Sequence, residues 1–333
     1  MRRSAPVPAG SGEPGRGRTG PGKAGRAAPA AHTPGAPGRA ALAVAGLALL
    51  HVGPAATWLP AVRRLLPGLA GAGAADHVAL TFDDGPDPRS TPRFLDELAR
   101  LGCRATFFVL GEMLERHPAL GRRVVADGHE IAVHGWHHGN ALAAAPGRTA
   151  AEIGAAARLV MAVTGVRPAW YRPPYGVLSA EALVAARVLG LRPVLWTAWG
   201  RDWTRSATPS SVLAALAPGL RGGATLLLHD SDHTSASGSW RSGLGALPEL
   251  VARCRSAGLR VGPLRDHGVS GVSGSRGSSG SRGAVRRHPV LHHTPGTAAP
   301  GNTGDAENTP GPWNGFHDNP LPTTRKEKPG AFQ

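Results

Sequence analysis

The central part of the chain alternates between strand-like and helix-like segments, and this alternation limits the possible folds more than any other feature. Seven short runs rich in apolar and β-branched residues predict strands, over residues 78–84, 104–111, 129–135, 170–176, 192–199, 224–230 and 259–264. Amphipathic runs of helical period lie between them, over residues 93–102, 118–127, 150–165, 179–190, 208–220 and 244–258. Such repeated alternation is typical of a (β/α) barrel or of a doubly wound parallel sheet.

Chemically reactive side chains occur where the predicted strands end, namely at Asp83, His134, Arg172, Asp202 and His229. In a barrel, the carboxyl ends of all strands face one mouth, and barrel enzymes carry their chemistry there. A doubly wound sheet collects ligands at only one or two switch points. Five separate strand ends therefore favour an α/β barrel of about seven strands, with the active site at the C-terminal strand ends.

Two adjacent carboxylates, Asp83 and Asp84, close the first predicted strand in TFDDGP (81–86). Like charges this close repel each other and raise each other's pKa. A metal ion or an arginine nearby is the simplest compensation.

Two histidines four residues apart, His134 and His138 in VHGWHHGN, could share one cation from a helical or tightly turned segment. Together with one aspartate they would give three protein ligands and an open position, which marks catalytic rather than structural metal sites. A pair of surface histidines is the plainer alternative. His137 lies between them, and the sequence does not separate it from the two ligand candidates.

Five short motifs then resemble one family when they are read in order: TFDDGP (81–86), HGWHH (134–138), RPPYG (172–176), DW (202–203) and LLLH (226–229). The order and spacing are similar to those of polysaccharide deacetylases, the NodB homology domain of carbohydrate esterase family 4. The resemblance implies a distorted (β/α) barrel over residues 76–265. It also implies a metal-dependent hydrolase that removes N-acetyl groups from polysaccharides containing N-acetylglucosamine, such as peptidoglycan or a chitin-like polymer.

The resemblance assigns a metal site and a base. Asp84, His134 and His138 would be the metal ligands, and Asp83 would be the general base, oriented by Arg172. Two imidazoles and one carboxylate suit Zn²⁺ best, with Co²⁺ or Ni²⁺ as alternatives.

The remaining motifs would supply the acid and the substrate contacts. Tyr175 would offer its backbone N–H to the oxyanion, and Trp203 and Leu227 would line a pocket for the acetyl group. His229 would be the general acid, and a buried Asp202 would raise its pKa. The partner implied by these roles is an acetylated polysaccharide.

Two other functions are compatible with the same residues. An O-acetyl esterase acting on glycans could use the same water and the same acid, and a catalytically inactive member could keep the fold to bind carbohydrate. Comparing acetate release from N-acetylated and O-acetylated substrates separates the first alternative from the N-deacetylase.

The flanking segments differ in composition from the central part. Residues 1–38 are rich in Gly, Pro and Arg and predict a disordered basic arm, and residues 266–333 predict a disordered tail. Between the arm and the domain, residues 39–75 hold the apolar run AALAVAGLALL (40–50). Its eleven residues are fewer than the roughly 20 that span a bilayer, so a signal peptide, an anchor and a packed helix all remain open.

These flanks bear on partners and location. Membrane contact is possible through residues 40–69, so we expect an extracytoplasmic or membrane-associated protein, with a cytoplasmic one as the alternative. The formal net charge is +15, but the basic arm lacks interleaved aromatic residues, and we expect no nucleic-acid partner. The two cysteines, Cys103 and Cys254, could form one bridge or remain two buried thiols.

Overall fold

The computed structural model describes residues 36–269, so most of the predicted basic arm and C-terminal tail lie outside the described residues. Eight parallel strands form one sheet in the order β5-β4-β3-β2-β1-β7-β6, and β8 pairs with the first half of β1. The strand bounds are β1 His77–Asp83, β2 Thr106–Val109, β3 Glu130–Val133, β4 Trp170–Tyr171, β5 Arg192–Pro193, β6 Ala198–Trp199, β7 Thr225–His229 and β8 Arg260–Gly262.

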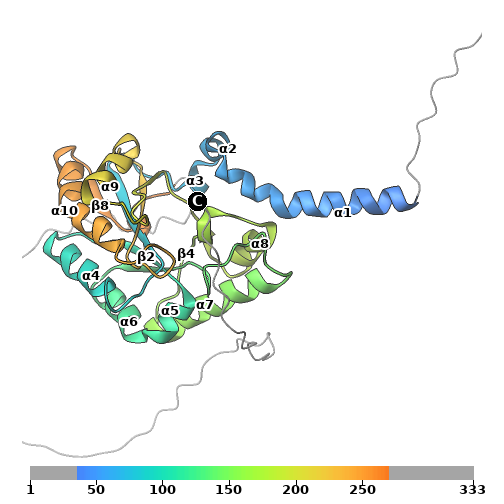
Figure 1. Ribbon diagram of the computed structural model, residues 1–333, viewed down its shortest axis with the longest axis horizontal. Coiled ribbons are helices and arrows are strands. Elements are labelled where there is room, and N and C mark those ends of the chain that lie inside the picture. Colours follow the sequence, from blue (N-terminus) through green and yellow to red (C-terminus); the bar gives the residue numbers. More distant parts are fainter. Residues whose placement is uncertain (1–35, 270–333) are drawn as a thin grey trace, which may run out of the picture. The chain divides into compact units, whose positions relative to one another are not determined.

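Helices connect the successive strands, except β5 and β6, and lie around the outside of the sheet (Figure 1). Their bounds are α4 Thr91–Arg100, α5 Gly111–Arg116, α6 Pro118–Ala126, α7 Arg148–Thr164, α8 Ala180–Val188, α9 Pro209–Leu216 and α10 Trp240–Ser256. Crossover helices of this kind allow neighbouring strands to run parallel. The predicted barrel is confirmed in its distorted form, because no ladder joins β5 to β6 among the described residues.

The alternation of side chains along β1 separates two packed layers. Val78, Leu80 and Phe82 point outward into the core beneath the helices, where Phe82 packs against Phe94 of α4. The intervening residues point into the barrel, and Ala79 belongs to a separate inner cluster. Because the side-chain period of a strand is two, this inner face also carries Asp83.

Two predicted strands are shorter than expected. Only Trp170–Tyr171 of residues 170–176 pairs as a strand, and Pro174–Gly176 form the 3-10 turn η2. The predicted strand over 192–199 is interrupted between β5 and β6. At this gap the backbone N–H of Leu195 bonds instead to the carbonyl of Leu69, at 2.7 Å.

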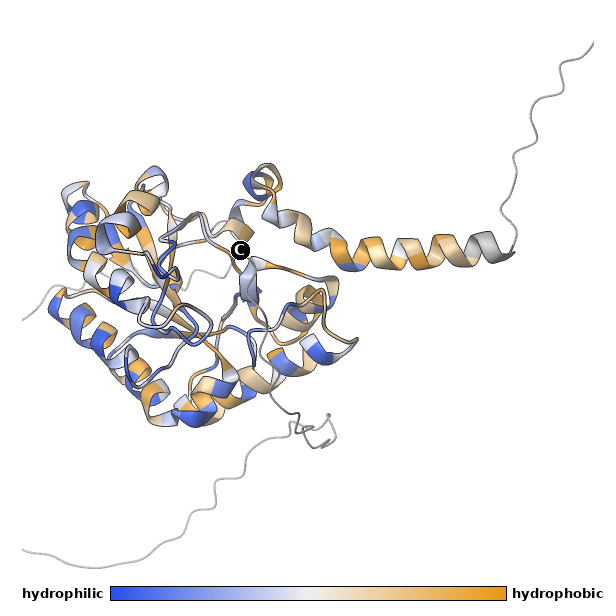
Figure 2. Ribbon diagram, in the orientation of Figure 1, coloured by the Kyte–Doolittle hydropathy of each residue, from blue (hydrophilic) through white to orange (hydrophobic). Residues whose placement is uncertain are grey.

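The segment before the barrel is helical. It consists of α1 Ala36–Val52, the 3-10 helix η1 Gly53–Trp58, α2 Pro60–Leu65 and α3 Pro67–Ala70. One continuous stretch, Ala40–Trp58, is long and apolar enough to cross a membrane, and α1 is largely hydrophobic (Figure 2). The apolar run of eleven residues noted in the sequence is shorter than this helical stretch, because the helical path continues through Gly53 and Pro54 as η1.

The described fold also extends past the expected domain end at residue 265. The 3-10 helix η4, Leu264–Asp266, is followed by His267, which is fully buried. Its Nδ1 lies 2.8 Å from Nδ1 of His77 at the start of β1. Residues 266–269 therefore belong to the folded part rather than to the tail. Both cysteines are buried free thiols, which answers the question left open by the sequence.

Candidate active site

The two adjacent carboxylates meet inside the barrel mouth because the chain leaves the strand between them. Asp83 is the last residue of β1, and Asp84 adopts a left-handed conformation with φ of 77°. Both side chains are buried. The chain then passes so close to Asp230 that a Cβ at Gly85 would lie 2.3 Å from its Oδ2, a contact that only glycine permits.

Arg172 compensates the first carboxylate. Its Nη1 donates to Asp83 Oδ1 at 2.7 Å and to Thr81 Oγ1 at 2.8 Å, and its Nη2 donates to Leu195 O at 2.9 Å. The guanidinium is fully buried, so this ion pair is shielded from solvent. Arg172 therefore fixes one oxygen of Asp83 in place.

Asp84 faces two imidazoles. Its Oδ1 lies 3.4 Å from Nε2 of His134 and 3.4 Å from Nε2 of His138. Ligand atoms of these three residues lie within 4.8 Å of one another, and no other such group of three occurs among residues 36–269. His137 instead points to Glu112, with its Nδ1 3.5 Å from Oε2, so it is not part of this group.

The local chemistry fits a divalent cation at these three residues. Asp84 Oδ1 is buried and has no hydrogen-bond partner within the described part of the chain, which is costly for a carboxylate oxygen. His134 Nδ1 lies 2.8 Å from the carbonyl of Arg172, and this contact places the ring proton on Nδ1 and leaves Nε2 free as a ligand. Burial lowers the pKa of His138 to about 4, so its ring is neutral near pH 7.

On the other side of the mouth, Asp202 holds His229. The His229 ring nitrogen Nδ1 lies 2.8 Å from Asp202 Oδ1, and the His229 backbone N–H donates to Oδ2 at 2.8 Å. Burial opposes protonation of the imidazole, but the attraction of Asp202 outweighs it and raises the pKa of His229 to about 10. His229 is therefore a protonated group at neutral pH.

A cavity of about 270 Å³ connects the group of Asp84, His134 and His138 with His229. Leu227, which is buried, and Trp203 line it, and the Trp203 ring lies 5.7 Å from the His229 ring. Tyr175 lines the same cavity from η2, with φ of 58° and half of its surface exposed. Arg172 and Asp202 are not cavity-lining residues, because they lie behind Asp83 and His229, respectively. The structure thus brings all ten predicted site residues to one place.

Several site residues were missed by the sequence reasoning. Thr81 could have been found, because it lies two residues before Asp83 and so shares its strand face. Thr234 gave no signal: its Oγ1 donates to Asp84 Oδ2 at 2.5 Å from the loop after β7. Three further tryptophans, Trp58, Trp196 and Trp199, line the same cavity.

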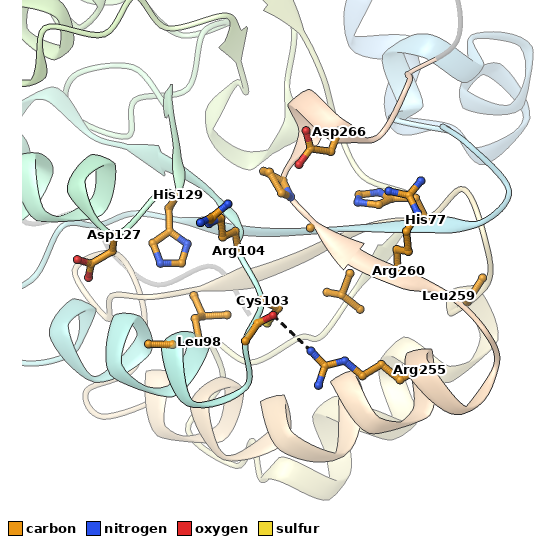
Figure 3. Close-up of a pocket in the computed structure, with 15 residues that line it drawn as sticks. His77, Leu98, Cys103, Arg104, Asp127, His129, Arg255, Leu259, Arg260 and Asp266 are labelled. Carbon is orange, nitrogen blue, oxygen red and sulfur yellow. Dashed lines mark hydrogen bonds between the residues drawn. The ribbon is translucent and has the colours of Figure 1, made fainter. Parts of the chain in front are cut away.

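A larger cavity, of about 780 Å³, lies elsewhere (Figure 3). It is lined by residues at the amino ends of the strands, including His77 of β1 and Arg260 of β8, and by His129 and Arg255. Parallel barrels carry their chemistry at the opposite, carboxyl end. The smaller cavity lies at the carboxyl ends of the strands and is lined by Asp84, His134 and His138, so it is the candidate active site.

Comparison with known proteins shows which family the chain resembles. A family model described as Polysaccharide deacetylase matches residues 70–194. A chitooligosaccharide deacetylase of Bradyrhizobium sp. (strain ANU 289) is 36% identical over 218 residues, which cover 61% of this chain and 94% of that protein. The peptidoglycan-N-acetylglucosamine deacetylase PgdA of Listeria monocytogenes is 34% identical over 161 residues, covering 48% of this chain but only 34% of PgdA.

Among solved structures, the peptidoglycan N-acetylglucosamine deacetylase Bc1960 is similar with a TM-score of 0.57 and 27% identity, covering 63% of this chain and 97% of that one. The match in fold thus extends over nearly the whole of that enzyme. Because the Bradyrhizobium relative is also matched over nearly its entire length, the chain belongs to the polysaccharide deacetylase family.

Proposed function

We propose that this protein is a metal-dependent hydrolase that removes N-acetyl groups from polysaccharides containing N-acetylglucosamine. The observation that carries the proposal is the buried, unpartnered Oδ1 of Asp84, which faces two imidazoles beside the Asp83–Arg172 pair. The family relatives named for chitooligosaccharides and for peptidoglycan support this substrate class.

Asp84, His134 and His138 would hold the cation, and Zn²⁺ suits two imidazoles and a carboxylate best, with Co²⁺ or Ni²⁺ as alternatives. A divalent cation bound there would lower the pKa of a water molecule and polarise the acetyl carbonyl. Thr234 donates a hydrogen bond to Oδ2 of Asp84, which leaves Oδ1 as the oxygen available to the cation.

Asp83 would take the proton of the attacking water. Its Oδ1 is engaged by Arg172, so Oδ2 is the oxygen turned toward the imidazoles, 3.6 Å from His134 Nε2. The ion pair with Arg172 holds this carboxylate in place, and a general base must lie within hydrogen-bond reach of the water it activates.

His229 would give a proton to the departing amine. Its Nδ1 is bound to Asp202, so the proton to be transferred is the one on Nε2. An amine leaves poorly unless it is protonated, so an imidazole held by a carboxylate suits the departing amine. Leu227 and Trp203 would enclose the acetyl methyl group, and the backbone N–H of Tyr175 would stabilise the oxyanion.

The proposed location is extracytoplasmic or membrane-associated. The apolar stretch Ala40–Trp58 supports it, since a single helix of that length can anchor or export a protein. Fractionation of cells that express the full chain checks it: recovery in the cytoplasm alone would contradict the proposal.

The function is tested by measuring acetate release from N-acetylated chitooligosaccharides, peptidoglycan fragments and O-acetylated glycans, with and without EDTA. We expect release from N-acetylated substrates, its loss with EDTA, and its recovery with added Zn²⁺ or Co²⁺. His138→Ala should lower bound metal and activity together. His137→Ala is the matched control, because its side chain points to Glu112. Release that EDTA leaves unchanged, or release from esters alone, would contradict the proposal.

A further inference from the structure

The segment that precedes the barrel, η1 to α3, is built into the barrel wall. It fills the gap between β5 and β6, where Leu195 N–H bonds to Leu69 O, and Thr225 Oγ1 of β7 donates to Gly71 O at 2.6 Å. Arg63 of α2 donates to Trp196 O at 3.4 Å, and its guanidinium lies 5.3 Å from the centroid of the Trp196 ring. Residues 53–71 are thus part of the wall of the active-site mouth.

Trp58 is the residue of this segment that reaches the active site. Its Nε1 donates to the carbonyl of Tyr175 at 2.9 Å, yet 46% of its surface is exposed. Its ring lies 6.4 Å from that of Trp199, and Trp199 lies 5.1 Å from Trp203, which borders His229. A row of indoles therefore runs from the proposed acid to the outer rim of the cavity.

A second cavity, of about 510 Å³, adjoins the active-site cavity along this row. Trp58, Trp196 and Trp199 line both cavities. Its volume lies within the range of about 300–1,000 Å³ that is usual for small-ligand pockets. A sugar whose acetyl group occupies the first cavity would have its neighbour in the polymer close to this shared aromatic wall.

The charge of the second cavity differs from that of the first. Arg63, Arg64 and Arg221 line it, and no acidic residue does. Arg64 and Arg221 are exposed, and within residues 36–269 none of the three arginines forms an ion pair. Guanidinium groups without a carboxylate partner are suited to bind a carboxylate supplied by a ligand.

We propose that this second cavity, with Trp58 and Trp199 as its aromatic shelf and the three arginines at its edge, is a subsite for a neighbouring sugar that carries an acidic group. The apolar face of a pyranose ring would lie on the indoles, which offer a large apolar area. The arginines would bind the carboxylate. This inference rests on the proposed function and selects one polymer class: a glycan whose alternate sugars carry an acidic substituent, such as peptidoglycan with free lactyl or peptide carboxylates, over neutral chitin-like chains.

Binding is measured on the zinc-loaded full chain carrying Asp83→Asn, so that turnover does not consume the ligand. Isothermal titration compares two tetrasaccharides of equal length: neutral chitotetraose and a peptidoglycan tetrasaccharide whose alternate sugars carry a lactyl carboxylate. We expect about tenfold or tighter binding of the acidic tetrasaccharide, since hydrogen bonds between charged groups are the stronger ones. Equal affinity for the two ligands would overturn the proposal.

Two sets of variants distinguish the contribution of the tryptophan shelf to binding from that of the arginine charges. Trp58→Ala should weaken both tetrasaccharides, by about tenfold. Arg64→Gln combined with Arg221→Gln should weaken only the acidic one, by about the factor that separates the two ligands in the parent protein. Leu65→Ala is the control, because Leu65 lies in the same segment with 79% of its surface exposed and lines neither cavity. A double arginine variant that leaves the preference intact would overturn the acidic assignment.

Trp58→Phe tests whether Trp58 acts as a shelf or only by holding Tyr175. Phenylalanine keeps a ring but loses the N–H···O bond to Tyr175, so binding should remain within about threefold of the parent. A loss of affinity as large as that of Trp58→Ala would overturn the role of Trp58 as a shelf.

Binding to vesicles that contain phosphatidylglycerol is the last experiment. Arginine variants that lose vesicle binding but still bind the acidic tetrasaccharide would assign the arginines to a membrane and overturn the proposal. Acetate release by the protein with Asp83 intact tests the proposed function separately, because the titrations need no turnover.

Discussion

The pair formed by Asp202 and His229 gives the sharpest prediction about pH. At neutral pH the raised pKa of His229, about 10, keeps its ring charged, and the cause that raises it is the carboxylate 2.8 Å from Nδ1. Replacing Asp202 with Asn removes that charge but keeps an oxygen that can accept a hydrogen bond. Burial is then opposed only by the smaller attraction of Asp84 and Asp83, so the pKa of His229 falls toward its ordinary value of about 6.5.

The size of the effect follows from Coulomb's law. Two unit charges about 4 Å apart at an effective dielectric constant of about 20 attract each other by about 4 kcal/mol. At about 1.4 kcal/mol per pKa unit, the loss of this attraction lowers the pKa of His229 by about three units. At pH 8 the protonated fraction of His229, and with it the rate, should fall by about 10-fold in Asp202→Asn. Near pH 5.5 the two proteins should differ only by a small factor.

The assay is the pH dependence of kcat/KM for acetate release between pH 5 and pH 9. A bound cation repels the imidazolium in both proteins, so the difference between the two profiles is the quantity to compare. Asp96→Asn is the control, since Asp96 pairs with Arg123 at the surface. An Asp202→Asn profile that has lost no activity selectively at high pH would refute the assignment of His229 as the acid.

Three further predictions concern the carboxylates and the metal site. Asp83→Asn should lower acetate release by at least about 100-fold while zinc content, measured by mass spectrometry, stays near one per chain; a near-normal rate would remove Asp83 as the base. Arg172→Met should lower the free energy of unfolding by about 3–5 kcal/mol in urea titrations, because Asp83 is then a buried charge without its partner. Arg100→Met, which breaks an exposed pair with Glu97, should change the free energy of unfolding far less, and equal losses would contradict the buried-pair argument. Thr234→Val should weaken zinc binding by about 10-fold to 100-fold, as measured by competition with a chelator, and unchanged affinity would exclude Thr234 as a support for Asp84.

The strand β1 shows how much of the active-site geometry the local sequence predicts. Its period of two places Thr81 and Asp83 on the inner face, and the left-handed turn at Asp84 then brings the second carboxylate to the same mouth. The sequence placed the end of the strand at these two carboxylates but did not indicate the left-handed conformation of Asp84. Backbone conformation at a single non-glycine residue depends on the surrounding packing, which local propensity does not contain.

The family motifs also show what the sequence can predict by itself. Periodicity and strand-end chemistry were sufficient to predict the barrel, the end of it that carries the site, and the residues that resemble the family motifs. These features depend on short-range spacing along the chain, which the sequence displays directly.

Only the tertiary structure showed what reaches the site from distant parts of the chain. Thr234 comes to Asp84 from a loop without any periodic pattern, and Trp58 comes from a segment that the sequence had placed outside the domain. The physical reason is the gap between β5 and β6: its open strand edge leaves Leu195 N–H without a ladder partner, and residues before the barrel fill it. The residues before the barrel and the gap between β5 and β6 are joined only by hydrogen bonds between distant parts of the chain. Motif spacing and periodicity along the sequence do not predict such contacts.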